Sequence, residues 1–372
     1  MKTGLKLYFP QKVLIDRTVL ESDYTQEILA RLKNIPQEVV DSKHIQGSVY
    51  DYHILYLTQN KGRFFRPCPC TNKNFYLSCE YRILEVGTNC IFNCTYCILQ
   101  SYLNQPFIQV YTNLDKLFAE LDSLTDFYRI GTGELTDSLF LDHITHLSTY
   151  LVPYFGKRKN LILELKTKST VIDNLKDLAH NRHTVVSWSL NAPEITAQEE
   201  SEAPGLKERL VAARKCQDWG YLLGFHFDPI IYFPGWETEY QKTIALLFQH
   251  IRPENIAWIS LGTFRFMPSL KSVIQRRFPQ SKIIYGEFIP ALDAKRRYFK
   301  PLRIHIYKKM LKWIKEYAPD VLVYLCMERP EVWQKVFGFV PEDIQLKEML
   351  DQRVKELSDG EKTPNRRNLK TN

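Results

Sequence analysis

Three cysteines lie close together in the sequence at a spacing that suits metal chemistry. Cys90, Cys94 and Cys97 form the pattern Cys-x3-Cys-x2-Cys within the run Gly-Thr-Asn-Cys-Ile-Phe-Asn-Cys-Thr-Tyr-Cys-Ile-Leu-Gln. Three soft thiolates on one tight loop can bind three irons of a cubane 4Fe–4S cluster and leave the fourth iron without a protein ligand. Because a substrate or cofactor can bind an open iron, the spacing predicts a catalytic cluster held by these three side chains.

A closed zinc site is the alternative to an iron–sulfur cluster. It would need a fourth ligand, which Cys68, Cys70 or Cys79 could supply. Structural zinc sites usually take their cysteines as two short knuckles, whereas Cys-x3-Cys-x2-Cys contains neither one knuckle nor two. The spacing therefore favours the iron–sulfur cluster.

The composition is that of an ordinary globular protein. Hydrophobic residues make up 44% and charged residues 25% of the 372 residues. No apolar stretch is long enough to span a bilayer, and residues 1–20 lack the apolar core of a signal peptide. Most of the eight cysteines cluster between Cys68 and Cys97, which favours metal binding over disulfides in a chain without an export signal. We expect a cytoplasmic protein that has no membrane partner.

The positive charge is concentrated in two runs that also contain aromatic residues. The formal net charge is +8, and the basic residues gather in 295–309 and in 61–66. Basic side chains interleaved with aromatic ones suit phosphates and stacked bases. We therefore predict nucleic-acid contacts by Arg296, Arg297 and Arg303. The alternative is an exposed helix face whose aromatic residues point into the core.

From about residue 81 the sequence alternates short apolar runs with amphipathic segments, which predicts a parallel sheet built from βα units. The predicted strands are 81–86, 127–131, 161–166, 184–190, 221–227 and 256–262, and the predicted helices are 114–124, 138–150, 172–180, 206–219, 237–250 and 269–278. The fold class is thus α/β, a partial (β/α)6 barrel. Active-site residues of such barrels lie at the carboxyl ends of the strands, and the cysteine loop follows the first predicted strand.

The chain divides into four predicted parts: a mixed α/β segment over 1–80, the partial barrel over 81–280, an extension over 281–357 and a tail over 358–372. The extension is predicted to contain a helix near 306–317, a strand over 321–326 and a final amphipathic helix. It also carries the basic run 295–309. The tail is polar and is predicted to be disordered.

The cysteine run, with Tyr96 just before the third cysteine, resembles the signature of the radical S-adenosylmethionine (SAM) superfamily. The resemblance implies that the open iron binds the amino and carboxylate groups of SAM, and that one electron from the cluster cleaves SAM to methionine and a 5′-deoxyadenosyl radical. The partial barrel is the usual core of that superfamily.

Polar residues follow the predicted strands at the edge where SAM would bind. After the second strand, the run Gly131 to Asp137 resembles a motif that holds the ammonium group of SAM, with Glu134 or Thr136 as the contact. The alternative is a glycine turn capped by Thr136 or Asp137. Lys168 and Ser189, after the third and fourth strands, could clamp the carboxylate. The remaining predicted contacts are Asn191, for ribose or carboxylate, and Asp228, which follows the fifth strand and would line the adenosyl pocket.

Together these residues resemble the spore photoproduct lyase family, radical SAM enzymes that split a thymine dimer in DNA. The similarity runs from about Phe64 to Gly338. It implies SAM-binding positions at Lys168, Ser189 and Asn191 and a functional tyrosine at Tyr96. It also implies DNA as the partner and an electron donor such as flavodoxin or ferredoxin.

Two positions depart from the lyase pattern. The lyases carry a hydrogen-donating cysteine after the second strand, where this chain has Glu134 or its immediate neighbours. A second family tyrosine, just after the third cluster cysteine, corresponds to Ile98. A carboxylate is a poor hydrogen-atom donor compared with a thiol. With Glu134 at this position, we do not expect dimer reversal by the same hydrogen-transfer route. Cys326, Cys68 or Cys70 could replace the thiol only if the fold brings them to the pocket.

Three functions are consistent with the sequence. The first is a radical SAM enzyme of the lyase type that splits pyrimidine dimers in DNA, after the target base has left the stack. The second keeps the radical chemistry, with RNA, a protein side chain or a metabolite as substrate. The third is a non-enzymatic metal-binding module for nucleic acid.

Overall fold

The protein is described by a computed structural model over residues 7–41, 51–69, 75–103 and 105–360. Cys70 and most of the predicted disordered tail lie outside these residues. None of the helices within these ranges is both long enough and apolar enough to cross a membrane.

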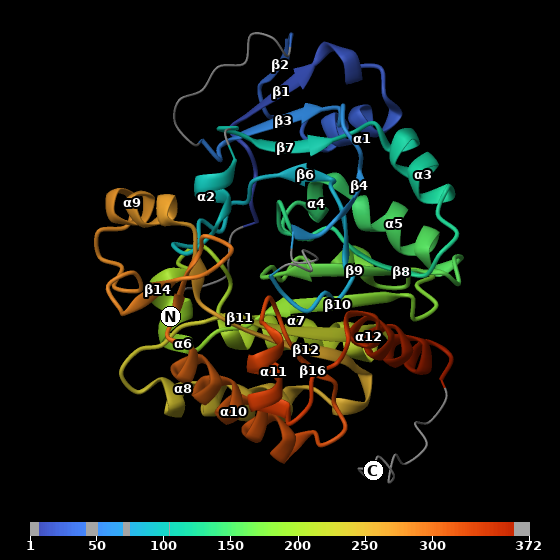
Figure 1. The fold of residues 1–372 in the computed structure, drawn as a ribbon. Coiled ribbons are helices and arrows are strands. Elements are labelled where there is room, and N and C mark those ends of the chain that lie inside the picture. The colour runs from blue at the N-terminus through green and yellow to red at the C-terminus, as the bar shows by residue number, and fades with distance from the viewer. Residues whose placement is uncertain (1–6, 42–50, 70–74, 104, 361–372) are drawn as a thin grey trace.

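A curled sheet forms the core of the molecule (Figure 1). Over the described residues it has eight strands, in the order β16-β12-β11-β10-β9-β8-β5-β4. Their bounds are β4 Phe65–Pro67, β5 Arg82–Leu84, β8 Tyr128–Gly131, β9 Leu161–Thr167, β10 Thr184–Ser189, β11 Leu222–Ile230, β12 Ile256–Thr263 and β16 Val323–Leu325. All neighbours run parallel except β4, which is antiparallel to β5. The six predicted barrel strands are confirmed, and β16 and β4 extend the sheet at its two ends.

Amphipathic helices cover this sheet. Helix α5 (Leu147–Gly156) packs on β9 and β10, α7 (Leu206–Asp218) on β10 and β11, and α10 (Lys300–Tyr317) and α12 (Asp343–Ser358) on β12. The other helices are α1 Asp23–Arg31, α2 Leu99–Tyr102, α3 Leu114–Asp122, α4 Asp142–Thr145, α6 Pro193–Glu199, α8 Trp236–His250, α9 Pro268–Arg277 and α11 Pro330–Phe337. The predicted helices over 114–124, 206–219, 237–250 and 269–278 are confirmed with small shifts at their ends, and the helix predicted near 306–317 is confirmed as part of the longer α10.

Two helix predictions were wrong. Residues 172–180 form only the 3₁₀ turn Asp173–Leu175, because Asp177 takes a left-handed conformation (φ 63°) and the Asn174 side chain instead binds the backbone oxygen of Asp142 at 2.8 Å. The segment 138–150 is broken at His146, which is also left-handed (φ 51°). The Asp142 carboxylate then accepts hydrogen bonds from the backbone and hydroxyl of Ser148, in the first turn of α5.

A second sheet lies above the barrel in Figure 1, in the order β2-β1-β3-β7-β6. Its strands are β1 Lys12–Asp16, β2 Gln37–Val40, β3 Ile54–Thr58, β6 Gly87–Thr88 and β7 Ile108–Tyr111. Strands β6 and β7 flank the cysteine loop in the sequence, so both ends of this loop are attached to the second sheet. A small third sheet joins β13 (Arg265–Phe266), β15 (Arg296–Tyr298) and β14 (Phe288–Pro290). The predicted boundary near residue 80 stays a prediction.

A buried ion pair fastens the C-terminal helix to the barrel. Arg129 on β8 donates a hydrogen bond of 2.7 Å to Asp351 on α12, with 3% and 7% of the two side chains exposed. Arg129 also donates to the backbone oxygen of Cys79. A buried charge that loses its partner is strongly destabilising, because the remaining charge stays out of water.

We predict that Asp351→Asn lowers the free energy of unfolding by about 3–5 kcal/mol, because it leaves the Arg129 guanidinium buried without its counter-charge. The matched control is Glu348→Gln on the exposed side of the same helix, which should change stability by less than about 0.5 kcal/mol. Urea unfolding followed by circular dichroism measures both. Equal stability of the two variants would contradict the role of the pair.

Candidate active site

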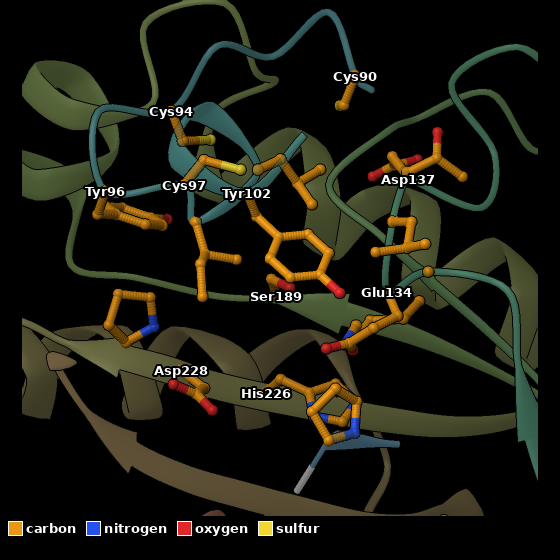
Figure 2. Close-up of a pocket in the computed structure, with 18 of the residues that line it drawn as sticks. Cys90, Cys94, Tyr96, Cys97, Tyr102, Glu134, Asp137, Ser189, His226 and Asp228 are labelled. Carbon is orange, nitrogen blue, oxygen red and sulfur yellow. The ribbon is translucent and has the colours of Figure 1, made fainter. Parts of the chain in front are cut away.

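A pocket of about 1090 Å³ opens at the carboxyl ends of the parallel strands. Figure 2 shows the cysteine loop along one side of it and the ends of β10 and β11 along the other. The fold brings most of the predicted site residues to this pocket. Those that line it are Cys90, Cys94, Tyr96, Cys97, Glu134, Thr136, Lys168, Ser189 and Asp228.

The start of the cysteine loop is held by Asn89. This residue has φ 69°, a left-handed conformation that asparagine tolerates better than most residues. Its side-chain amide donates to the backbone oxygens of Gln105 and Phe107 at 2.8 and 2.7 Å. Its backbone N–H donates to the oxygen of Leu135 at 2.9 Å, in the loop after β8. These bonds fix Cys90 against the loop that carries Glu134.

The second half of the loop is a tight turn held by backbone oxygens. The N–H of Cys97 donates to the oxygen of Cys94 at 3.0 Å, and the Gln100 side chain donates to the same oxygen at 2.6 Å. The N–H of Thr95 donates to the oxygen of Glu199 at 2.9 Å, which ties the turn to α6. As a result Cys94 and Cys97 lie side by side in the pocket wall (Figure 2).

The three cysteines suit a cluster by the chemistry of their donor atoms. Burial raises the pKa of the Cys94 thiol to about 12 and raises the pKa values of Cys90 and Cys97 as well, so a bound metal would have to displace the protons. Within the described ranges no three His, Cys, Asp or Glu side chains converge on one point that would suit a single ion. A cubane does not require such a point, because each thiolate binds a different iron. The residues therefore fit an iron–sulfur cluster.

A buried carboxylate organises the side of the pocket next to Tyr96. Glu200, whose side chain is 1% exposed, accepts hydrogen bonds from the Tyr96 hydroxyl and the Arg209 guanidinium. The Lys168 ammonium lies 5.7 Å from the centre of the Tyr96 ring. Burial alone would lower the pKa of Lys168, but the charge of Glu200 and then the thiol of Cys94 raise it, so Lys168 stays cationic. No role for Glu200 was predicted from the sequence.

In the loop after β8, some polar side chains stabilise the loop and others face the pocket. Glu134 forms an ion pair of 3.5 Å with Lys166, while the Thr136 hydroxyl donates to the backbone oxygen of Asn89 at 2.7 Å and keeps its lone pairs for a further donor. Asp137 accepts bonds from the backbone of Lys168 and from other groups around the turn. Asp137 therefore caps the turn over residues 138–140, but no helix begins there, because α4 begins only at Asp142. Glu134 faces the pocket (Figure 2).

Asn191 does not line the pocket. It is 1% exposed, and its side chain accepts a hydrogen bond from Tyr240 and donates to the backbone oxygen of Pro229 at 3.1 Å. These bonds link the ends of β10 and β11 behind the pocket wall, which argues against the predicted cofactor contact. Asp228 does reach the pocket, but both of its carboxylate oxygens are bound by Arg265 at 2.9 Å.

Two of the three arginines predicted to contact nucleic acid are interior residues. Arg297 and Arg303 are 4% and 5% exposed. Arg297 pairs with Asp293 at 2.8 Å, and Arg303 pairs with Glu328 at 2.9 Å. Because their charges are already neutralised inside the protein, this placement corrects the prediction that they contact phosphates. Arg296 is half-buried and remains a candidate.

The floor of the pocket is a polar layer inside the barrel that the prediction of strand-end residues missed. Glu164 on β9 accepts hydrogen bonds from Ser187 at 2.7 Å, His226 at 2.8 Å and Trp258 at 3.2 Å. The second ring nitrogen of His226 lies 2.6 Å from the Ser260 hydroxyl. This layer could have been predicted from the polar residues that occur at every second position of otherwise apolar strands. Alternate residues of a strand face the same side of the sheet, so such polar side chains are expected to lie together.

Two further residues line the pocket: Tyr102, which had no predicted role, and Cys326, one of the cysteines considered as a replacement for the missing thiol. Tyr102 lies four residues after Ile98, so it occupies the same side of the short helix α2, and its side chain extends into the pocket (Figure 2). Cys326 directly follows β16 and lines the pocket near Asp228 and Arg265. Burial, then Asp228, raises the pKa of the Cys326 thiol well above its usual range.

The comparisons with known proteins agree with this architecture. A sequence model of the spore photoproduct lyase family matches residues 72–314. The spore photoproduct lyase of Bacillus subtilis is 28% identical over 326 residues, which cover 84% of this chain and 92% of that protein. The enzyme of a Geobacillus species is 31% identical over 229 residues, 59% of this chain and 65% of the relative, so that match spans less than two thirds of the relative's length.

Solved structures show the same fold. Spore photoproduct lyase complexed with dinucleoside spore photoproduct superposes with a TM-score of 0.77, at 23% identity, over 86% of this chain and 100% of that one. A mutant of that lyase with bound AdoMet and dinucleoside spore photoproduct has a TM-score of 0.76 with the same identity and coverage.

A half-barrel whose parallel strands end at a loop with three cysteines, beside a pocket lined by polar strand ends, is the architecture of radical SAM enzymes. The family match covers well over half of the sequence. The chain therefore belongs to the spore photoproduct lyase family.

Because of the buried Glu164 carboxylate in the pocket floor, we expect the free energy of unfolding to fall at acidic pH. Burial alone would raise the pKa of Glu164, but His226 lowers it to about 2. A lowered pKa in the folded state stabilises the protein above the unfolded value of about 4.3, and this contribution is lost as the pH falls towards 2.

We therefore expect Glu164→Gln to remove about 3 kcal/mol of stability at neutral pH and to flatten the decline in stability between pH 5 and pH 2. Urea unfolding at several pH values in that window measures both effects. Glu194→Gln, at an exposed position of α6, is the matched control and should follow the wild-type profile. Identical profiles for the two variants would exclude the proposed interaction of Glu164 with His226.

Proposed function

We propose that this protein is a spore photoproduct lyase, a radical SAM enzyme that splits the carbon–carbon bond joining two thymines in damaged DNA. The observation that carries the proposal is the convergence of the three cysteines, Lys168 and Ser189 on one pocket in a chain that belongs to this family. The comparisons favour this substrate over RNA, a protein side chain or a metabolite.

The pocket residues divide between the two cofactors of the proposed reaction. Cys90, Cys94 and Cys97 would hold a 4Fe–4S cluster, and together with SAM this cluster supplies a carbon radical able to remove a hydrogen atom from an unactivated carbon. Lys168 and Ser189 would bind the SAM carboxylate, because a half-buried ammonium beside a hydroxyl suits an anion. Glu134 would accept hydrogen bonds from the SAM ammonium group.

The size of the pocket supports a second, larger ligand beside the cofactors. At about 1090 Å³ it slightly exceeds the usual range for a single small molecule, about 300–1,000 Å³. A thymine dimer must leave the base stack to reach the reacting carbon, and an extruded dinucleotide would need this extra space. The proposed enzyme works on DNA in the cytoplasm and receives its electron from a flavodoxin or ferredoxin.

The substrate is tested with the anaerobically reconstituted full chain, SAM, dithionite and dinucleoside spore photoproduct. We expect thymidine to be formed in amounts that depend on SAM. The variant Cys94→Ala should lose the iron absorbance and thymidine formation together, whereas Cys216→Ala, at a buried position outside the pocket, should keep both. Cleavage of SAM by the wild type without any formation of thymidine would overturn the proposed substrate while leaving the radical chemistry in place.

The role of Lys168 is tested by SAM binding. Lys168→Gln should weaken SAM binding roughly ten- to a hundredfold, about 1.5–3 kcal/mol, because it removes a hydrogen bond to a charged group. The iron content should stay unchanged, since Lys168 is not a ligand. Isothermal titration calorimetry gives the affinity, with Lys176→Gln at an exposed position as the control. Wild-type affinity in Lys168→Gln would remove this residue from the proposed site.

A further inference from the structure

Exposed positive charge gathers beside the pocket on α9 and on the turn that follows this helix. Residues 255–286 contain five basic side chains and no acidic one, so this stretch has no counter-charge of its own. One of the five, Arg265, is paired with Asp228 inside the pocket. The other four are exposed: Lys271, Arg276, Arg277 and Lys282. They form a basic surface next to the cavity.

Three of these cations keep their charge available to a partner. Among the residues that the structure describes, no hydrogen bond or ion pair joins the side chain of Lys271, Arg276 or Lys282 to a carboxylate. On α10, by contrast, Lys309 is paired with Glu237 at 3.0 Å. A cluster of surface cations without counter-charges attracts an anionic partner.

Helix α9 belongs to the wall of the pocket. Met267, the residue before its first turn, and Arg277, its last residue, both line the cavity. The Arg277 guanidinium donates to the side-chain oxygens of Gln100 on α2 and, at 2.8 Å, of Asn93 on the cysteine loop. Helix α9 accordingly lies beside α2 (Figure 1). Both acceptors are neutral amides, so these two bonds orient the guanidinium at the pocket without cancelling its charge.

Exposed tyrosines accompany these cations. Tyr102, at the end of α2, is 63% exposed, and its side chain extends into the pocket (Figure 2). Tyr285, three residues after Lys282, is 59% exposed. Cations bind phosphates, and an exposed aromatic ring beside them can stack on an unpaired base. This combination favours a nucleic-acid strand over an acidic protein as the partner.

We propose that Lys271, Arg276, Arg277 and Lys282 bind the phosphodiester backbone of the DNA that enters the pocket. This assignment rests on the proposed function, in which an extruded dinucleotide occupies the cavity. The dinucleotide stays joined to the flanking strand, so that strand crosses the rim of the pocket. Arg277 binds phosphate next to the lesion, and the other three cations bind phosphates further along. Contacts of this kind position the strand and do not depend on its base sequence.

The test uses the full chain and a fluorescein-labelled, undamaged DNA duplex, with binding followed by fluorescence anisotropy at several salt concentrations. The α9 variant combines Lys271→Gln, Arg276→Gln and Lys282→Gln, and Arg277 is kept because it also holds the cysteine loop. We expect the affinity at low salt to fall roughly tenfold or more. The slope of log affinity against log salt should become shallower by about three, about one for each lost phosphate contact.

The matched control removes the same charge elsewhere. It combines Lys215→Gln, Lys308→Gln and Lys312→Gln, at exposed positions of α7 and α10, two helices that contribute no residue to the described pocket wall. This control should keep the affinity and the salt slope close to those of the wild type. An equal loss in the two triple variants would overturn the proposal, because the effect would then come from net charge alone.

Wild-type affinity and slope in the α9 variant would also overturn the proposal, as would the absence of DNA binding by the wild type at low salt. If the α9 variant binds DNA normally but its reconstituted cluster is reduced more slowly by flavodoxin, the surface serves an acidic protein instead. Because the probe is undamaged DNA, failure to cleave the lesion would count against the proposed function and not against this surface.

Discussion

The parallel direction of the barrel strands is the constraint on which the rest of the structure depends. Because β5, β8, β9, β10, β11, β12 and β16 all run the same way, their carboxyl ends meet at one edge of the sheet. The loops that leave this edge must then share a limited space. The cysteine loop, the Glu134 loop and the residues after β9, β10 and β11 are brought to one pocket for this reason.

Such a crowded edge must also accommodate buried charge. Glu200 and Glu164 are 1% and 3% exposed, and each is stabilised by several donors rather than by one. Glu200 connects Tyr96 on the cysteine loop to Arg209 on α7, and Glu164 connects strands β9, β10, β11 and β12 across the floor. Since removing one partner leaves a charge without compensation, these networks keep the pocket in a single arrangement. The same interactions that stabilise the fold therefore position the groups proposed to bind SAM.

The pocket also shows how this chain differs from the lyase pattern. The resemblance predicts that Glu134 or an immediate neighbour stands where the family carries a hydrogen-donating cysteine, and that Ile98 stands where it carries a second tyrosine. The structure brings Cys326 and Tyr102 into the same pocket from other elements, the loop after β16 and the end of α2. A thiol and a phenol, the two groups that this chain lacks at those predicted positions, are thus present on other parts of the cavity wall. In a radical reaction, the position of a hydrogen-atom donor relative to the substrate decides whether it can act. Cys326 and Tyr102 are therefore the residues at which hydrogen-atom return in this protein would differ from that of the lyase pattern.

The sequence by itself determined the local features of this protein. The spacing of Cys90, Cys94 and Cys97 predicted the site, and the alternation of apolar runs predicted the six barrel strands to within a few residues, because period and spacing are properties of neighbouring residues. Only the tertiary structure decided which distant residues meet. It paired Glu200 with Tyr96, placed Cys326 beside Asp228, and turned Arg297 and Arg303 from predicted phosphate contacts into interior ion pairs. A run of basic residues has the same sequence whether its side chains lie on the surface or in the interior. Their burial depends on the elements that pack against the run, and these elements come from distant parts of the chain.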